Sequence, residues 1–247
     1  MTNDLRDHFA RLDWAAVEIG TLEAEIAEFL SSHPIEIRFH YDLGTGNRVY
    51  KAYQAKDPPK GIQIRTGTII NELRSTLDAL AVTLAARNGA TKFDDTYFPM
   101  GKTKDIFAEK RVRDRMKRLS DSDQAIITNL QPYQGGNDLL YTLHLADIIR
   151  KHQRLVLSAA QTNQLLMGKG DWILDGGRVV LITNPGGPIG RGLFIAELSH
   201  DYHIDFEITG EIAFSEPPFI KGNPVLETLR QFLALVHSIL KLFERAP

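Results

Sequence analysis

The chain contains no cysteine among its 247 residues. A protein without thiols cannot form a disulfide, hold a metal through thiolate ligands or use a cysteine nucleophile. Neither sign of charge is in large excess, since the formal net charge is only −2. Nucleic-acid binding through the overall field of the protein is therefore not expected, although a local basic surface could still provide it.

Long apolar runs are absent as well. The most apolar segment, VLETLRQFLALVHSILKLF, is interrupted by Arg230, Gln231, His237 and Lys241. Such a segment is typical of a buried amphipathic helix rather than of a membrane span. The opening residues, MTNDLRDHFARLDW, contain neither a basic leader nor an apolar run followed by small residues. We expect a cytoplasmic protein that does not associate with membranes.

Apolar residues recur at spacings of three and four in four long segments, which predicts four long helices. These helices are expected at about residues 3–31, 66–87, 137–167 and 223–243. Shorter helices are expected at 103–118 and 120–129, the second with Ser120 and Asp123 in a capping arrangement.

Alternating apolar and polar residues predict strands at 35–41 and 48–55 and in three stretches of 172–214. The three stretches are RVVLIT, LFIAEL and HIDFEI, which we expect to form an antiparallel sheet. There is no internal repeat and no evident linker. The sequence therefore predicts one compact α+β domain over residues 1–247, with a bundle of about four long helices and an antiparallel sheet of about five or six strands.

Two familiar kinds of site are not predicted. The glycine-rich stretch NPGGPIGRG (184–192) contains two prolines without an N–H and precedes a strand, so a turn is favoured over a phosphate loop. His144 and His152 are eight residues apart, or about 12 Å along a helix, which is too far for one metal ion. We expect neither a metal nor a cofactor.

A basic helix is expected within KTKDIFAEKRVRDRMKRL, which has eight basic residues against three acidic ones. Arg111, Arg115 and Arg118, spaced four and three apart, would line one positive surface. This surface is either an ordinary solvated helix face or a set of phosphate contacts.

Basic side chains also gather in HLADIIRKHQRLV (144–156). They are His144, Arg150, Lys151, His152 and Arg154. The apolar seam of this helix is expected to consist of Leu145, Ile148, Leu155 and Ala159. His152 falls on the same seam, and His144 and Lys151 lie beside it.

A histidine on a buried seam is expected to have a partner, because buried polar groups are nearly always hydrogen-bonded. The second long helix can supply it through Arg74 and Asp78, which lie one turn apart beside the apolar seam of that helix. We therefore predict a polar cluster between two helices, made of Arg74, Asp78, His144 and His152.

Five motifs appear in order across most of the chain. They are LRSTLDALA (73–81), YFPM (97–100), LQPY (130–133), KHQRLV (151–156) and GNPVLETLRQFLALVHSIL (222–240). Together they resemble a widespread family of uncharacterised bacterial proteins, whose members often read Arg-Ser-x-Leu-Asp-His-Leu-Ala and Asp-Lys-His-Arg at the first and fourth motifs. An arginine followed five positions on by histidine also resembles the signature of HEPN proteins, helical nucleotide-binding domains that include metal-independent ribonucleases.

The HEPN resemblance implies a helical bundle and a mechanism in which histidine acts as acid or base while arginine stabilises the phosphorane charge. Here Ala79 stands where the motif has histidine, five positions after Arg74. The fourth motif differs too, with Arg150 and Gln153 in place of aspartate and arginine. The acid or base must then be His152 or His144.

Two functions remain open. The first is a non-catalytic binding or assembly module, which we favour because Ala79 removes the histidine that the second requires. The second is a HEPN-like metal-independent endoribonuclease, with catalytic candidates His152, Arg74, Asp78 and Arg150. The ligand-binding candidates are Lys151, His144, Arg154, Arg111 and Arg115. The candidate partners are RNA or a nucleotide and a second copy of the chain.

Overall fold

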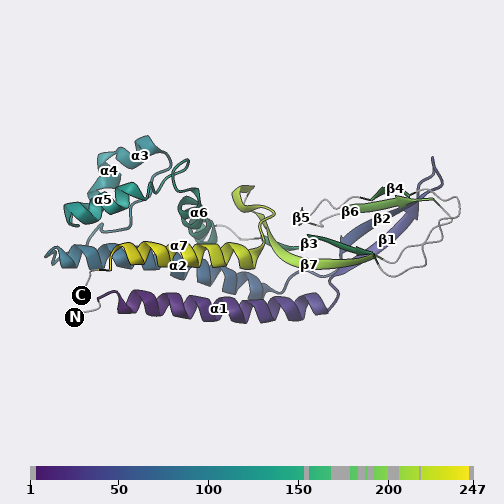
Figure 1. Ribbon diagram of the computed structural model, residues 1–247, viewed down its shortest axis with the longest axis horizontal. Helices are drawn as coiled ribbons and strands as arrows, with labels where there is room; N and C mark the ends of the chain where they lie inside the picture. The colour runs from purple at the N-terminus through teal and green to yellow at the C-terminus, as the bar shows by residue number, and fades with distance from the viewer. Residues whose placement is uncertain are drawn as a thin grey trace. The chain divides into compact units, whose positions relative to one another are not determined.

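The computed structural model describes residues 4–152, 156–167, 179–182, 187–188, 192–199, 206–216 and 218–244. These residues contain seven α-helices and seven strands, so the predicted α+β class is confirmed (Figure 1). The predicted counts are not matched, because the described residues form seven helices, four of them long, and two sheets, where we expected about four long helices and one sheet of five or six strands. The described residues form two compact units, and the single domain over residues 1–247 stays a prediction.

The first unit comprises the described residues within 1–22, 64–155 and 226–247. Its long helices are α1 (Arg6–Ser31), α2 (Lys60–Arg87), α6 (Asp138–His152) and α7 (Val225–Leu242), of which α1 and α2 also extend into the second unit. None of the helices in the described ranges is long and apolar enough to cross a membrane.

Helices α1, α2 and α7 share an apolar core. His8 of α1 forms a 2.8 Å hydrogen bond with Thr83 of α2, and the ring of Phe9 lies 5.6 Å from that of His237 of α7. The stripe predicted for the last helix is fully buried. Its members include Leu229, Phe232, Val236 and Ile239. The three-and-four spacing therefore identified the buried face of α7 correctly.

The basic segment forms three short pieces instead of one helix. They are α3 (Lys104–Ala108), α4 (Lys110–Arg113) and the 3₁₀ helix η1 (Asp114–Met116). Thr103 caps α3, and the extended backbone of Glu109 ends it and starts α4. The next helix, α5 (Asp121–Asn129), begins at Ser120, whose hydroxyl accepts from the N–H of Asp123 as the capping pattern predicted.

Two loop motifs lie side by side in the first unit. The N–H of Gly101, which follows YFPM, donates to the carbonyl of Pro132 in LQPY at 3.0 Å. A Cβ at Gly101 would lie only 2.7 Å from the backbone of Phe107, so glycine is required by this close approach. The contact fixes the loop that carries Tyr97 and Phe98.

The second unit comprises the described residues within 23–63 and 156–225. A four-stranded antiparallel sheet has the order β1 (Ile35–Tyr41), β2 (Arg48–Gln54), β6 (Leu193–Leu198) and β4 (Val179–Ile182). A three-stranded antiparallel sheet has the order β5 (Gly187–Pro188), β3 (Val156–Met167) and β7 (Phe206–Glu216). The predicted strands at 35–41 and 48–55 are confirmed, and the strands of 172–214 divide between both sheets rather than forming one.

The predicted long helix over 137–167 is wrong in its second half. Helix α6 ends at His152, and residues 156–167 form β3. The segment VLSAAQTNQLLM contains good helix formers, but β3 pairs with β7 along most of its length, for example Leu157 with Phe214 and Ala159 with Ile212. Pairing with a distant strand overrides the local helical preference of this segment. The local sequence of the segment does not indicate that pairing.

Candidate functional site

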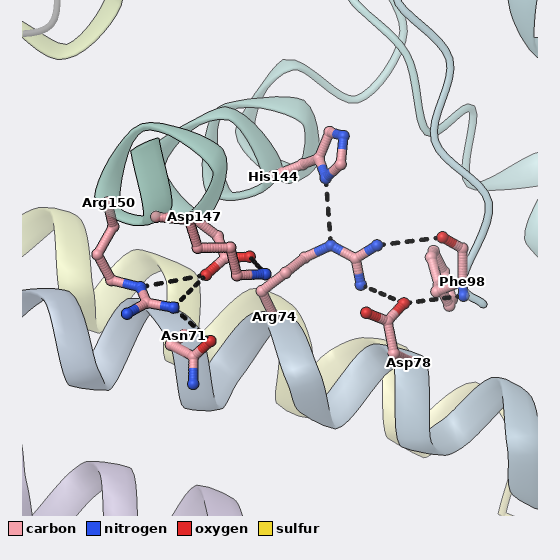
Figure 2. Close-up of polar contacts among 8 residues, drawn as sticks. Asn71, Arg74, Asp78, Phe98, His144, Asp147 and Arg150 are labelled. Carbon is pink, nitrogen blue, oxygen red and sulfur yellow. Dashed lines mark hydrogen bonds and ion pairs between the residues drawn. The ribbon is translucent and has the colours of Figure 1, made fainter. Parts of the chain in front are cut away.

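A polar cluster joins α2, α6 and the loop that precedes α3 (Figure 2). Arg74 of α2 is its centre, with a side chain that is only 7% exposed. Its Nε donates to Nδ1 of His144 at 3.3 Å, one Nη lies 2.8 Å from Oδ1 of Asp78, and the other donates to the carbonyl of Phe98 at 3.2 Å. All three nitrogens of the guanidinium are therefore engaged by the protein itself.

Asp78 also binds the loop that carries Phe98. The same oxygen that pairs with Arg74 accepts from the N–H of Phe98 at 3.0 Å. The backbone of Phe98 is thus held at its donor and at its acceptor by two residues one turn apart on α2. The predicted proximity of Arg74, Asp78 and His144 is confirmed.

His144 is held as a neutral imidazole. Burial lowers its pKa to about 4, and the positive charges of Arg74, Arg115 and Lys151 act in the same direction, while Asp147 opposes them. Because Nδ1 accepts from Arg74, the proton of the neutral ring is on Nε2. Figure 2 shows this second nitrogen pointing away from Arg74.

Asp147 is a member of the site that the sequence analysis missed. Its side chain is 4% exposed and lies 2.5 Å from Nζ of Lys151 and 3.3 Å from the guanidinium of Arg150. Arg150 also donates to Oδ1 of Asn71 on α2 at 2.7 Å. The available signal was the spacing of Asp147, Arg150 and Lys151 at i, i+3 and i+4, which favours ion pairs on one helix face.

The predicted seam of α6 is wrong at Ile148, which is exposed, and Leu145 is only half-buried. Among the described side chains of this helix, the buried ones are Leu140, Leu143, Ala146 and Asp147. Apolar residues occur on more than one face of α6, so spacing alone did not single out the buried one. The side chains of His152 and Ala159, and all of Arg154 and Leu155, lie outside the described residues.

A cavity of about 390 Å³ lies at α4 and η1, also in the first unit. Its lining residues are Asp95, Tyr97, Arg111, Asp114, Arg115 and Lys117. The structure thus brings together the predicted ligand-binding pair Arg111 and Arg115 and adds Lys117. Arg118, which we expected on the same surface, instead donates to the carbonyl of Asp94 and to Thr96 Oγ1.

The cavity and the polar cluster both involve the loop that carries Tyr97 and Phe98. Arg118 holds the backbone just before Tyr97 through Asp94 and Thr96, and Arg74 and Asp78 hold Phe98 just after it. Tyr97 lies between these two attachments and is 51% exposed. The position of this aromatic wall therefore depends on the cluster.

Comparisons with protein-family models, curated proteins and solved structures found no match to this chain. Within the described ranges, no group of three His, Asp or Glu residues is arranged so that it could hold a metal ion. The chemistry of the site therefore has to be argued from its own side chains.

The titration of His144 gives a testable pH dependence. Its pKa is about 4 in the folded chain against 6.5 for a free histidine, so the unfolded chain binds more protons between these values. The resulting stability is fully present above about pH 6.5 and is lost as the pH falls towards 4. Replacing His144 with asparagine keeps an acceptor for Arg74 but removes the titration.

We therefore expect the melting temperature to fall less steeply from pH 7 to pH 4.5 in His144→Asn than in the wild type. Thermal unfolding across this range measures the difference, and the carboxylates act equally in both proteins. If the melting temperatures of the two proteins fall with pH at the same slope, the neutral, desolvated state of His144 is contradicted.

Proposed function

We propose that this protein is a non-catalytic binding module for an anionic ligand, in which the Arg74, Asp78 and His144 cluster assembles the ligand site. The occupied guanidinium of Arg74 carries the proposal. A catalytic arginine must offer N–H groups to the charge that develops on a phosphate. Arg74 is buried, and three of its five N–H groups, one on each nitrogen, already donate to His144, Asp78 and Phe98.

The anionic character of the ligand is supported by the cavity. Arg111, Arg115 and Lys117 line it, and among the described residues none of them forms an ion pair or hydrogen bond with a carboxylate. Asp95 and Asp114 line the same cavity, so its five charged side chains sum to a net charge of +1, and neutrality requires one further anion. A ligand with a phosphate group meets this requirement, since arginine binds phosphate with two parallel hydrogen bonds.

One observation favours a second function, the HEPN-like metal-independent endoribonuclease. His144 of α6 lies against Arg74 and so supplies in space a histidine that Ala79 does not supply in sequence. In this alternative His144 or His152 would transfer protons. A histidine with a pKa of about 4 is a weak base at neutral pH, which is why we prefer the binding module.

A cleavage assay separates the two functions. Purified protein is incubated with single-stranded RNA and a chelator, and the wild type is compared with His144→Asn and His152→Ala. The binding module is expected to leave the RNA intact in all three proteins. Chelator-resistant cleavage that disappears in either variant, with its melting temperature unchanged, would establish the ribonuclease instead.

The proposal also includes the cytoplasm as the location and, as partners, RNA or a nucleotide and a second copy of the chain. Light scattering on protein eluted from a size-exclusion column measures the molar mass and so tests whether a second copy is bound. A mass equal to one chain at every concentration would remove that partner.

A further inference from the structure

We infer that the cavity at α4 and η1 binds one nucleotide unit, with its phosphate on Arg111, Arg115 and Lys117 and its base on the ring of Tyr97. This inference rests on the proposed function and names the chemical class of the ligand. The same chemistry occurs in a free mononucleotide and in a single-stranded RNA.

The first argument is the state of the cations. Three other arginines of the first unit form ion pairs within the protein: Arg74 with Asp78, Arg87 with Asp4, and Arg150 with Asp147. Arg111 and Arg115, by contrast, line the cavity together with Lys117, and within the described part of the chain they form no ion pair and no side-chain hydrogen bond. Arg115 is half-buried, whereas Arg111 and Lys117 are exposed, so the charge of Arg115 is the least screened by solvent of the three.

The second argument is the aromatic wall. Tyr97 is exposed beside these cations, although its neighbour Phe98 is completely buried. The chain is attached on both sides of Tyr97, by Arg118 to the carbonyl of Asp94 and the hydroxyl of Thr96, and by Arg74 and Asp78 to the backbone of Phe98. A tyrosine whose neighbours in the chain are fixed presents its ring at a lower entropic cost, and proteins stack single-stranded bases on exposed aromatic rings.

The third argument concerns charge and size. Asp95 and Asp114 line the same cavity, so its five charged residues carry three positive and two negative charges, a net of +1. This balance suits a single phosphate group better than a triphosphate, and carboxylates can accept hydrogen bonds from ribose hydroxyls. The volume of about 390 Å³ lies within the range of small-molecule sites.

The test is calorimetric titration of the full-length protein with inorganic phosphate, adenosine monophosphate and a six-residue oligoadenylate. We expect the mononucleotide to bind on the order of tenfold to a hundredfold more tightly than inorganic phosphate, because of base stacking. Tyr97→Ala should abolish this margin, while Tyr97→Phe should keep it. Arg115→Gln should weaken all three ligands at least about tenfold.

Lys110→Gln is the matched control, because Lys110 is an exposed cation of α4 that does not line the cavity. It should bind all three ligands like the wild type. An oligoadenylate that binds more tightly than the mononucleotide, with a steeper salt dependence, identifies a strand as the source. Equal affinities identify the free nucleotide.

Two results would overturn the inference, and they are distinguishable. If inorganic phosphate and the mononucleotide bind equally, the nucleotide assignment is wrong while the anion-binding module stands. If none of the three ligands binds, both are wrong. Melting temperatures measured on the same samples show that each variant is folded.

Discussion

Replacement of Arg74 by methionine is expected to lower the free energy of unfolding by about 3 kcal/mol, the scale for breaking a buried ion pair by removing one partner. Methionine keeps most of the apolar length of the side chain but removes every N–H. Asp78, the carbonyl of Phe98 and Nδ1 of His144 each lose a donor. Because Asp78 is 35% exposed and keeps its bond from Phe98 N–H, the loss falls at the lower end of that scale. Urea denaturation measures it.

Arg11→Met is the matched control for Arg74→Met. Arg11 of α1 pairs with Glu72, also on α2, at 3.4 Å, but both side chains are substantially exposed to solvent. Exposed pairs contribute about 0 to 1 kcal/mol, so this variant should stay close to the wild type. Equal losses in the two variants would show that the Arg74 cluster contributes no more than a surface pair.

Phe98→Ala is expected to lower the free energy of unfolding by about 3 to 5 kcal/mol, the range for removing a buried phenylalanine ring. Phe98 is 0% exposed and is among the largest fully buried side chains of the described residues. Its backbone also receives the bonds from Arg74 and Asp78. The variant should therefore lose stability and should also displace Tyr97 from the cavity, which weakens mononucleotide binding.

Phe93→Ala is the control for this second substitution, since Phe93 lies in the same loop and is 38% exposed. It should lower the free energy of unfolding by less than about 1 kcal/mol and leave binding unchanged, as is usual for surface positions. Denaturation and calorimetry on the same preparations provide both readouts. A stable Phe98→Ala protein would contradict the role of this residue as the anchor of the loop.

The polar cluster shows how far a sequence can predict a site. Arg74 and Asp78 are one turn apart on a helix, and a basic stretch on another helix needed partners, so their meeting with His144 could be predicted from spacing and from the cost of unpaired buried charge. The loop partner Phe98 could not be predicted. It contributes backbone atoms, and backbone hydrogen-bonding groups are the same at every non-proline residue.

Only part of the lining of the cavity could be predicted from the sequence. The spacing of Arg111 and Arg115 indicated a shared positive surface, but nothing local to Asp95 or Tyr97 indicates that they lie opposite it. That juxtaposition depends on Arg118, which binds the loop instead of joining the positive surface as we had expected. Sequence spacing does not show which arginine binds a loop and which lines the cavity. The tertiary neighbours of each arginine decide this.

The sequence by itself determined the α+β class, the buried stripe of α7, the paired strands β1 and β2 and the Ser120 cap. Each of these follows from a pattern within about 20 residues, because helix and strand periodicity and end-capping are local. Only the tertiary structure decided that residues 156–167 form β3, that the strands divide between two sheets, and that Asp147 rather than Ile148 is buried on α6. These choices depend on contacts between helices and on pairing with strands that are about 50 residues away for β3 and β7 and about 150 residues away for β2 and β6. Such non-local interactions outweigh local preferences of less than about 1 kcal/mol per residue.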